Sequence, residues 1–305
     1  MKRIPFPTFS LSQARRLTAL LAVLLLSWSA LAVHYPVTVV DDLGREVTLE
    51  AAPQRVVSMI PSSTEIICAL DACDLLVGVD EFSNYPAQVQ ELPDMGSAFT
   101  PNLEAIVALE PDLVLAEEYS GIVGQLENLG IPVYSATAQT LDQVWEVTEA
   151  LGLLLDREIE AALLEGRVTG ELQAIGELVE GGDAPTVFVE LDATPFSAGP
   201  GSYIDELVQL AGGENILDES FGDFPQVDPE YVVAADPQVV LLFDAPFGET
   251  AATVEMRPGW SGVAAVREGR VIELTQEQVD MLSRPGPRLG QAVAFLARVF
   301  HPDRF

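Results

Sequence analysis

The sequence predicts an α/β fold in which two Rossmann-like lobes are joined by a single long backbone helix. Two observations lead to this fold class. Short β-branched runs alternate with helical segments on both sides of the centre of the chain, which is typical of largely parallel sheets covered by helices. The centre itself, residues 141–180, contains no convincing strand and keeps its apolar residues at the three- and four-residue spacing of helices.

A repeated unit links the two halves of the chain. The stretch NLEAIVALEPDLVLA, residues 102–116, aligns without a gap with DPEYVVAADPQVVLL, residues 228–242. Each copy is predicted to be a short helix that runs into a buried strand. Glu104 in the first copy corresponds to Glu230 in the second. The repeat indicates that the two lobes are built on a similar plan.

Residues 1–32 are predicted to be a secretory signal peptide. Four basic residues precede an apolar run at 17–26, and a small-x-small cleavage site follows at 30–32. A transmembrane anchor is the weaker alternative, because the run is short for a full span and no basic flank follows it. Cleavage is predicted before Val33, and the residue directly after the site is therefore not a cysteine. We expect an exported, periplasmic or otherwise extracytoplasmic protein without a lipid anchor.

The chain is strongly acidic. Its net charge is −32, and the first 32 residues hold four of the 15 basic residues and no acidic one, so the remainder carries 11 basic against 47 acidic residues. Such a surface repels nucleic acid and anionic lipid, and neither is expected as a partner. After residue 32 there is no lysine, which fits either a saline habitat or a general bias towards solubility.

The N-terminal lobe is expected over residues 33–140. The capping-box spacing of Ser62 and Glu65 predicts that a helix starts there. A second helix starts near Asn102 with the first copy of the repeat. Strands are predicted at residues 55–59, 75–79, 113–116 and 131–136.

The two cysteines, Cys68 and Cys73, lie five residues apart in a helix-like stretch and do not share a helical face. One short loop is not a disulfide framework, so two small buried thiols are the favoured interpretation. The spacing allows a bridge if the helix ends near Leu70.

Residues 141–182 are expected to form a helical region, in which a helix of about 24 residues connects the lobes. Six apolar residues of this helix are predicted to lie near one face: Ile159, Leu163, Val168, Leu172, Ile175 and Val179. The C-terminal lobe is expected over residues 183–305. Its strands are predicted at 186–191, 239–243 and 270–274, and its helices at 199–213, from 228, and at 286–300.

The order and spacing of these segments resemble the helix-linked solute-binding proteins of ABC importers. That family captures vitamin B12, haem and iron–siderophore complexes outside the cytoplasmic membrane. The chain looks most like the members that bind vitamin B12, which implies capture of a corrinoid, with haem or an iron–siderophore complex as the alternative. The resemblance is carried by RVVSMIPSSTEIICAL, LLVGVDEFSNYP, NLEAIVALEPDLVLA, LGIPVY, PFSAGPGSYIDELVQLAGGENI, FPQVDPEYVVAADPQVVLL, AVREGRVIEL and RPGPR.

The resemblance implies a ligand cleft between the lobes, where domain interfaces commonly place binding sites. It places ligand contacts at Phe82, Phe99, Phe224, Asp280 and Arg284. Flat aromatic faces suit a macrocycle, although each phenylalanine could equally belong to the core of its lobe. The bound ligand would be a metal-containing macrocycle or chelate, and neither a resident cofactor nor a metal site is expected.

Glu104 and Glu230 stand where the family pairs a glutamate of each lobe with arginines of a permease dimer, and such pairs set orientation and encounter rate. The alternative is local, because each glutamate lies in the first turn of a helix behind an Asx cap. A carboxylate there stabilises the helix by about 0.3–1 kcal/mol through the helix dipole. The protein itself is expected to be a monomer.

No enzymatic activity is expected. The two histidines, His34 and His301, suit neither a catalytic triad nor a metal cluster, and no nucleophile elbow, P-loop or dinucleotide motif occurs. The least favoured alternative is a secreted carboxylate-dependent hydrolase that uses Glu104 and Glu230 as its acid pair. Equivalent positions on opposite lobes give these two carboxylates no reason to approach each other.

Overall fold

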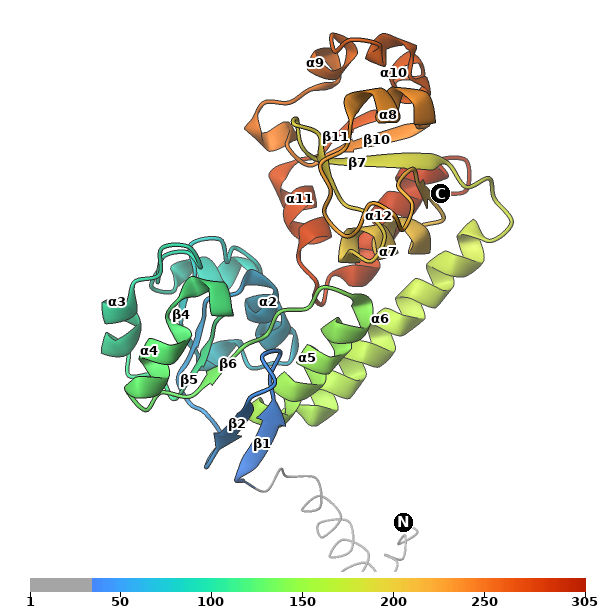
Figure 1. Cartoon of the computed structure of the whole chain (residues 1–305). Helices are drawn as coiled ribbons and strands as arrows, with labels where there is room; N and C mark the ends of the chain where they lie inside the picture. Colours follow the sequence, from blue (N-terminus) through green and yellow to red (C-terminus); the bar gives the residue numbers. More distant parts are fainter. Residues whose placement is uncertain (1–34) are drawn as a thin grey trace, which may run out of the picture.

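The computed structural model describes residues 35–305, and the predicted signal peptide and His34 lie outside this range. Figure 1 shows the two predicted α/β lobes, and they are joined by a pair of long helices where the sequence predicts a single long one. The predicted boundary between residues 182 and 183 falls in the loop that leads into the first strand of the C-terminal lobe. Within the described residues, no helix is both long enough and apolar enough to cross a membrane.

The N-terminal lobe is built on a parallel sheet with the strand order β4-β3-β5-β6. Successive residues of β5 belong to different cores, because Leu113 and Leu115 pack on one face of the sheet and Val114 packs on the other. A strand that is apolar on both faces needs helices on both sides. The elements are β3 (Val56–Ser58), α2 (Pro61–Ala69), β4 (Leu76–Val79), α3 (Leu103–Ala108), β5 (Leu113–Leu115), α4 (Val123–Asn128) and β6 (Val133–Tyr134).

An antiparallel hairpin that the sequence analysis did not foresee precedes this sheet. It consists of β1 (Val37–Val40) and β2 (Glu46–Leu49). Val39, Val47 and Leu49 are buried in the main core, and β1 contacts the first long helix. The hairpin therefore forms an outer wall of the N-terminal lobe.

The prediction of free thiols was wrong, because Cys68 and Cys73 form a disulfide. Helix α2 ends at Ala69, and the chain then turns back into a 3-10 helix, η2 (Cys73–Leu75). This turn brings the two Cα atoms to 4.2 Å from each other. The condition that allowed a bridge, an early end of the helix, is therefore met.

The predicted capping box at Ser62 is also wrong. Helix α2 begins at Pro61, its N-cap is Ile60, and no side chain caps it. Proline is well suited to the first helical position, because its fixed φ matches the helix and its missing N–H is not needed there. The carboxylate of Glu65 is consequently free to bind elsewhere.

Two helices form the connection between the lobes: α5 (Leu141–Leu155) and α6 (Glu158–Val179), which pack against each other. The length of α6 agrees with the prediction, but its buried face is partly wrong. Ile159 is 50% exposed and Leu163 is 68% exposed. The buried face consists of Ala161, Leu164, Val168 and Ile175.

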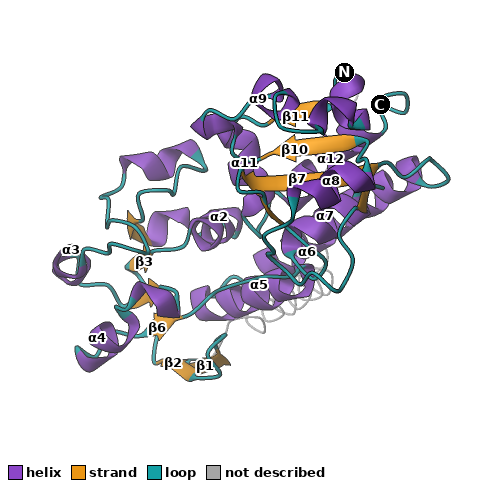
Figure 2. Ribbon diagram, turned by 45° about the horizontal axis from the view of Figure 1, so that its top comes forward, coloured by secondary structure: helices purple, strands orange, loops and turns teal. Residues whose placement is uncertain are grey.

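The C-terminal lobe repeats the plan of the first lobe. Its sheet has the order β11-β10-β7-β8, and β9 also pairs with β7. Strand β10 lies between β7 and β11 and is parallel to both (Figure 2). The elements are β7 (Thr186–Asp192), β8 (Phe196–Ser197), α7 (Tyr203–Leu210), β9 (Glu214–Asn215), α8 (Pro229–Ala235), β10 (Val239–Leu242), α9 (Ala251–Glu255), α10 (Ala264–Arg267), β11 (Val271–Glu273), α11 (Gln276–Ser283) and α12 (Leu289–Phe300).

One apolar cluster passes through both lobes. It contains Val56 and Ile66 of the N-terminal lobe, Val168 of α6, and Val187 and Val293 of the C-terminal lobe. Helix α6 makes its contacts with both α5 and α12, so it joins the two inner faces. Each lobe has a further, smaller apolar cluster, which covers the outer face of its sheet.

Candidate functional site

A pocket lies between the lobes at the carboxyl ends of the N-terminal strands. In the sheet order β4-β3-β5-β6, the neighbours of β3 are β4 on one side and β5 on the other. The connections that follow β3 and β5 therefore run to opposite sides, which leaves a crevice at the carboxyl ends of these strands. The pocket has a volume of about 300 Å³ and includes Ile60 after β3 and Glu117 after β5. Arg284 and its neighbours close it from the C-terminal lobe. We call this pocket the cleft.

Two exposed aromatic side chains of the N-terminal lobe adjoin residues that line the cleft, Arg284 and Tyr119. Phe82 is 54% exposed and Phe99 is 80% exposed, so neither is a core residue. The ring of Phe99 lies against that of Tyr119, with 5.5 Å between the centroids. Tyr119, which the sequence analysis missed, lines the cleft and is 60% exposed. These faces are available to a flat ligand.

Phe224 occupies a different place. It lies on the loop between β9 and α8 of the C-terminal lobe and is half exposed. Within residues 35–305, no hydrogen bond, ion pair or ring contact joins it to the other four predicted ligand contacts. Its side chain is therefore accessible, but no such contact in the described chain links it to Phe82, Asp280 and Arg284, which are joined to one another.

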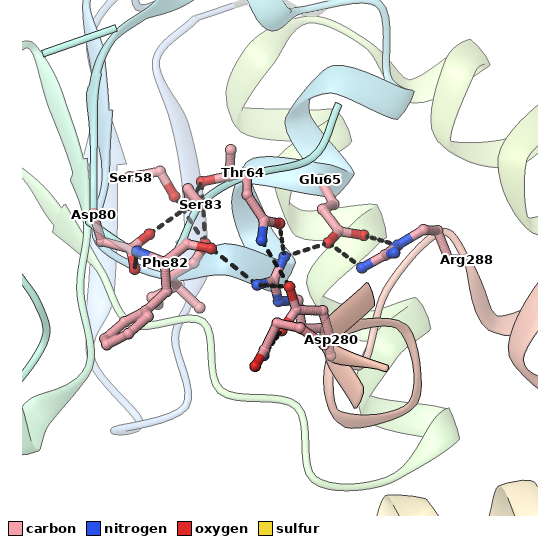
Figure 3. A network of polar contacts seen from close by, with 12 residues as sticks. Ser58, Thr64, Glu65, Asp80, Phe82, Ser83, Asp280 and Arg288 are labelled. Atoms are coloured by element: carbon pink, nitrogen blue, oxygen red, sulfur yellow. Dashed lines mark hydrogen bonds and ion pairs between the residues drawn. The ribbon is translucent and has the colours of Figure 1, made fainter. Parts of the chain in front are cut away.

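A buried ion-pair network joins the lobes beside the cleft (Figure 3). Glu65 of α2, which is 2% exposed, accepts hydrogen bonds from Arg288 at 2.7 Å (Nε) and 2.6 Å (Nη2). Arg284 donates to the same carboxylate at 3.0 Å. Arg288 also lies over the ring of Tyr85, at 4.5 Å from its centroid. This carboxylate of the N-terminal lobe thus holds two guanidinium groups of the C-terminal lobe.

The two predicted polar contacts belong to this network. Arg284 pairs with Asp280 at 3.0 Å and donates to the carbonyl oxygen of Phe82 at 2.9 Å. Asn84 donates to Asp280 at 2.7 Å and accepts from Arg284 at 2.8 Å. Gln276 occupies the other oxygen of Asp280, at 2.7 Å. The charges of Glu65, Asp280, Arg284 and Arg288 balance, which is the condition for burying them together.

The network also fixes the loop that carries Phe82. Asp80 accepts from the backbone N–H of Phe82 at 3.1 Å and from the hydroxyl of Ser83. The hydroxyl oxygen of Ser83 also lies 2.9 Å from that of Thr64 of α2. The ring of Phe82 points away from these polar groups (Figure 3). The loop is thus tied to both lobes while its aromatic ring remains free for a ligand.

Two carboxylates near the cleft have perturbed acidity. Burial raises the pKa of Asp80, and the nearby Arg284 only partly opposes this effect. Burial likewise raises the pKa of Glu117, although the hydroxyls of Tyr119 and Thr137 donate to it. Carboxylates that are costly to ionise are common in functional clefts.

A second buried ion pair lies at the carboxyl ends of the C-terminal strands. Arg257 binds Glu190 of β7 through two hydrogen bonds, of 2.6 and 2.5 Å, and contacts Glu249 at 2.9 Å. Asp244, two residues after the end of β10, has one buried oxygen without a hydrogen-bond partner in the described chain. Burial and the neighbouring Glu190 raise the pKa of Asp244 to about 6.

Glu104 and Glu230 lie at matching places on the outer helices of the two lobes. Both are exposed, in the first turns of α3 and α8, and the N-caps Asn102 and Asp228 accept from backbone N–H groups. Neither glutamate forms an ion pair within the described residues. An apolar pocket of about 620 Å³ that includes Trp260 adjoins Glu230.

Glu65, Arg288, Glu117 and Tyr119 were missed as site residues. Glu65 was explained as part of a capping box, so its longer-range partner was not sought. Arg288 stands in the RPGPR segment, and its spacing of four from Arg284 was the available signal.

Comparisons with known proteins agree with this architecture. A family model described as periplasmic binding protein matches residues 56–278. The ABC transporter substrate-binding lipoprotein YvrC of Bacillus subtilis is 31% identical over 282 residues, which cover 89% of this chain and 87% of that protein. A cobalamin-binding protein of Halobacterium salinarum is 30% identical and covers 88% of this chain and 75% of its own length.

Solved structures extend the same comparison. The periplasmic vitamin B12-binding protein BtuF of Vibrio cholerae matches with a TM-score of 0.69 and 29% identity, over 82% of this chain and 97% of that chain. The periplasmic haem-binding protein RhuT of Roseiflexus sp. RS-1 matches with a TM-score of 0.69 and 26% identity, over 84% of this chain and 100% of that chain.

Proposed function

Because the chain belongs to the periplasmic binding protein family, in which proteins bind solutes for ABC importers, we propose that its ligand is a corrinoid. The protein would be exported by residues 1–32, capture the corrinoid between its lobes and deliver it to a permease dimer. The observation that carries the ligand class is the set of exposed aromatic faces in and beside the cleft: Tyr119 in its lining, Phe99 against Tyr119, and Phe82 on the loop held by Arg284. Such faces bind a macrocycle with few fixed hydrogen bonds.

The predicted contacts act in two ways in this proposal. Phe82 and Phe99 supply apolar area to the ligand from the N-terminal lobe, and Phe224 is proposed to add to it from the C-terminal lobe. Asp280 and Arg284 orient the loop of Phe82 and present their remaining polar edges to the ligand. Because α6 and the Glu65 network hold the lobes together, ligand binding is expected to cause only a small closure.

Haem is the second candidate, and one observation favours it. Haem iron can be held by a tyrosine, and Tyr119 is an exposed tyrosine at the cleft. The carboxylate of Glu117 in the same wall opposes haem, because haem carries two propionates.

Calorimetric titration with cyanocobalamin, hemin and a ferric hydroxamate tests the ligand. We expect one-to-one binding of cyanocobalamin with a Kd below about 1 μM, equivalent to more than about 8 kcal/mol. Alanine at Phe82 should weaken that binding by at least tenfold, whereas Phe305→Ala, at an exposed position by the C-terminus, should not change it. Binding of hemin or the hydroxamate in place of cyanocobalamin would reject the corrinoid.

Delivery is proposed to depend on Glu104 and Glu230, which would pair with arginines of the two permease subunits. In the double variant Glu104→Ala/Glu230→Ala we expect unchanged ligand affinity and loss of uptake in reconstituted transporter. Glu177→Ala, at an exposed position on α6, is the matched control. Normal uptake by the double variant, together with a lowered melting temperature, would leave the two glutamates only their helix-dipole role.

A further inference from the structure

A larger pocket lies next to the cleft, and we call it the side pocket. It has a volume of about 820 Å³ and lies between the β1–β2 loop, the segments after β5 and β6, and the start of α5. Glu117, Tyr119 and Thr137 line both the side pocket and the cleft. A ligand that rests in the cleft therefore has these three residues at its border with the side pocket.

The side pocket is acidic, and no basic residue occurs in its lining among residues 35–305. Arg45 pairs with Asp41 of the lining and also donates to Glu127 at 2.7 Å, so its charge is already neutralised. The carboxylates of the side pocket belong to Asp41 and Asp42 of the hairpin loop, Glu117 and Glu118 after β5, and Glu146 of α5.

A buried hydroxyl without a hydrogen-bond partner is an independent sign that the side pocket binds a ligand. Ser135 lines the side pocket and is 1% exposed, and its Oγ has no hydrogen-bond partner in the described chain. Buried polar atoms are usually satisfied, so such an atom is a place where a bound group would gain a hydrogen bond. Glu117, at the border with the cleft, keeps acceptor capacity beyond the bonds from Tyr119 and Thr137.

We propose that Glu117 and the side pocket determine specificity, by selecting ligands whose edge carries hydrogen-bond donors, namely the primary carboxamides of a corrinoid, over ligands that carry carboxylates there. This inference rests on the proposed function. A carboxamide N–H₂ donates to a carboxylate, and the bond is strengthened by the charge. A ligand carboxylate at the same place meets fixed negative charge without a counter-ion and is repelled.

The test compares cyanocobalamin with its monocarboxylic acids, in which one peripheral carboxamide has been hydrolysed. The two ligand types differ in one amide, so the ratio of their Kd values isolates the edge chemistry. For the wild-type protein we expect at least one monoacid to bind about tenfold more weakly than the amide form at low salt. This factor is the one expected from a single repulsive contact between two carboxylates close to the protein surface. In Glu117→Gln this ratio should fall to about threefold or less.

Glu177→Gln changes the total charge by the same amount on the exposed face of α6 and should leave the ratio unchanged. If Glu117→Gln keeps the wild-type ratio, or if the control lowers it equally, the inference is overturned while corrinoid binding stands. If wild-type protein does not bind cyanocobalamin, the proposed function fails and this inference fails with it.

Discussion

Replacing Glu65 with glutamine should destabilise the protein severely, because Glu65 is the carboxylate that neutralises Arg288 between the lobes. The substitution keeps the shape of the side chain and removes the charge. Arg284 would retain Asp280 and the carbonyl of Phe82, at 3.0 and 2.9 Å. Arg288 would lose its salt-bridge partner and keep only its position over Tyr85.

The size of the effect follows from this asymmetry. Removing one partner of a buried ion pair costs about 3–5 kcal/mol, since the remaining charge stays buried without compensation. For a chain of this size 1 kcal/mol changes the melting temperature by about 2–4 °C, so we expect a loss of about 10 °C. Urea unfolding followed by circular dichroism gives the free energy directly.

The control is Arg167→Gln, which removes one member of the solvent-exposed pair Arg167–Glu171 on α6. Exposed pairs of this kind contribute about 1 kcal/mol or less. A loss in Glu65→Gln no larger than in Arg167→Gln would refute the claim that the network holds the lobes together.

Three further effects are expected. The double variant Cys68→Ser/Cys73→Ser should lose about 2 kcal/mol, the chain-entropy value for a short loop, and reductant should lower the melting temperature of the wild type but not of the variant. The raised pKa of Asp244 means that the folded state binds more protons than the unfolded state between about pH 4 and 6. Stability should therefore fall as the pH rises through that window, and Asp244→Asn should raise the melting temperature at pH 8 and leave a flatter profile; an identical pH profile would contradict this. Val168→Ala, in the buried face of α6, should cost about 2 kcal/mol, whereas Leu163→Ala, 68% exposed, should cost less than about 0.5 kcal/mol; equal losses in urea unfolding would show that the buried face is misassigned.

Patterns that depend on neighbouring residues were predicted well. The repeat at 102–116 and 228–242 becomes a capped helix followed by a buried strand in both lobes, and the helical centre becomes α5 and α6. These features follow from the hydrophobic period and from turn residues, and both can be identified within a short stretch of sequence. The positions of Glu104 and Glu230 on equivalent helices follow from the same signals.

Features that depend on distant partners were not predicted. Glu65 satisfies a local capping rule as a sequence, yet it binds Arg288, 223 residues later. The buried face of α6 is fixed by contacts with α5 and α12, so two apolar residues that fit a helical period remain exposed. Cys68 and Cys73 are joined because α2 ends at Ala69, and helix ends are the least certain part of a local pattern.

The apolar cluster that passes through both lobes limits how this protein can be recombined. A chimaera that took one lobe from a relative would have to match the packing of α6 against both α5 and α12, and the Glu65–Arg288 pair as well. The lobes are therefore not interchangeable modules, and a hybrid cut at residues 182–183 should express poorly. The loops at the strand ends, which lie outside that shared core, are the natural units for transplanting a new ligand preference onto this scaffold.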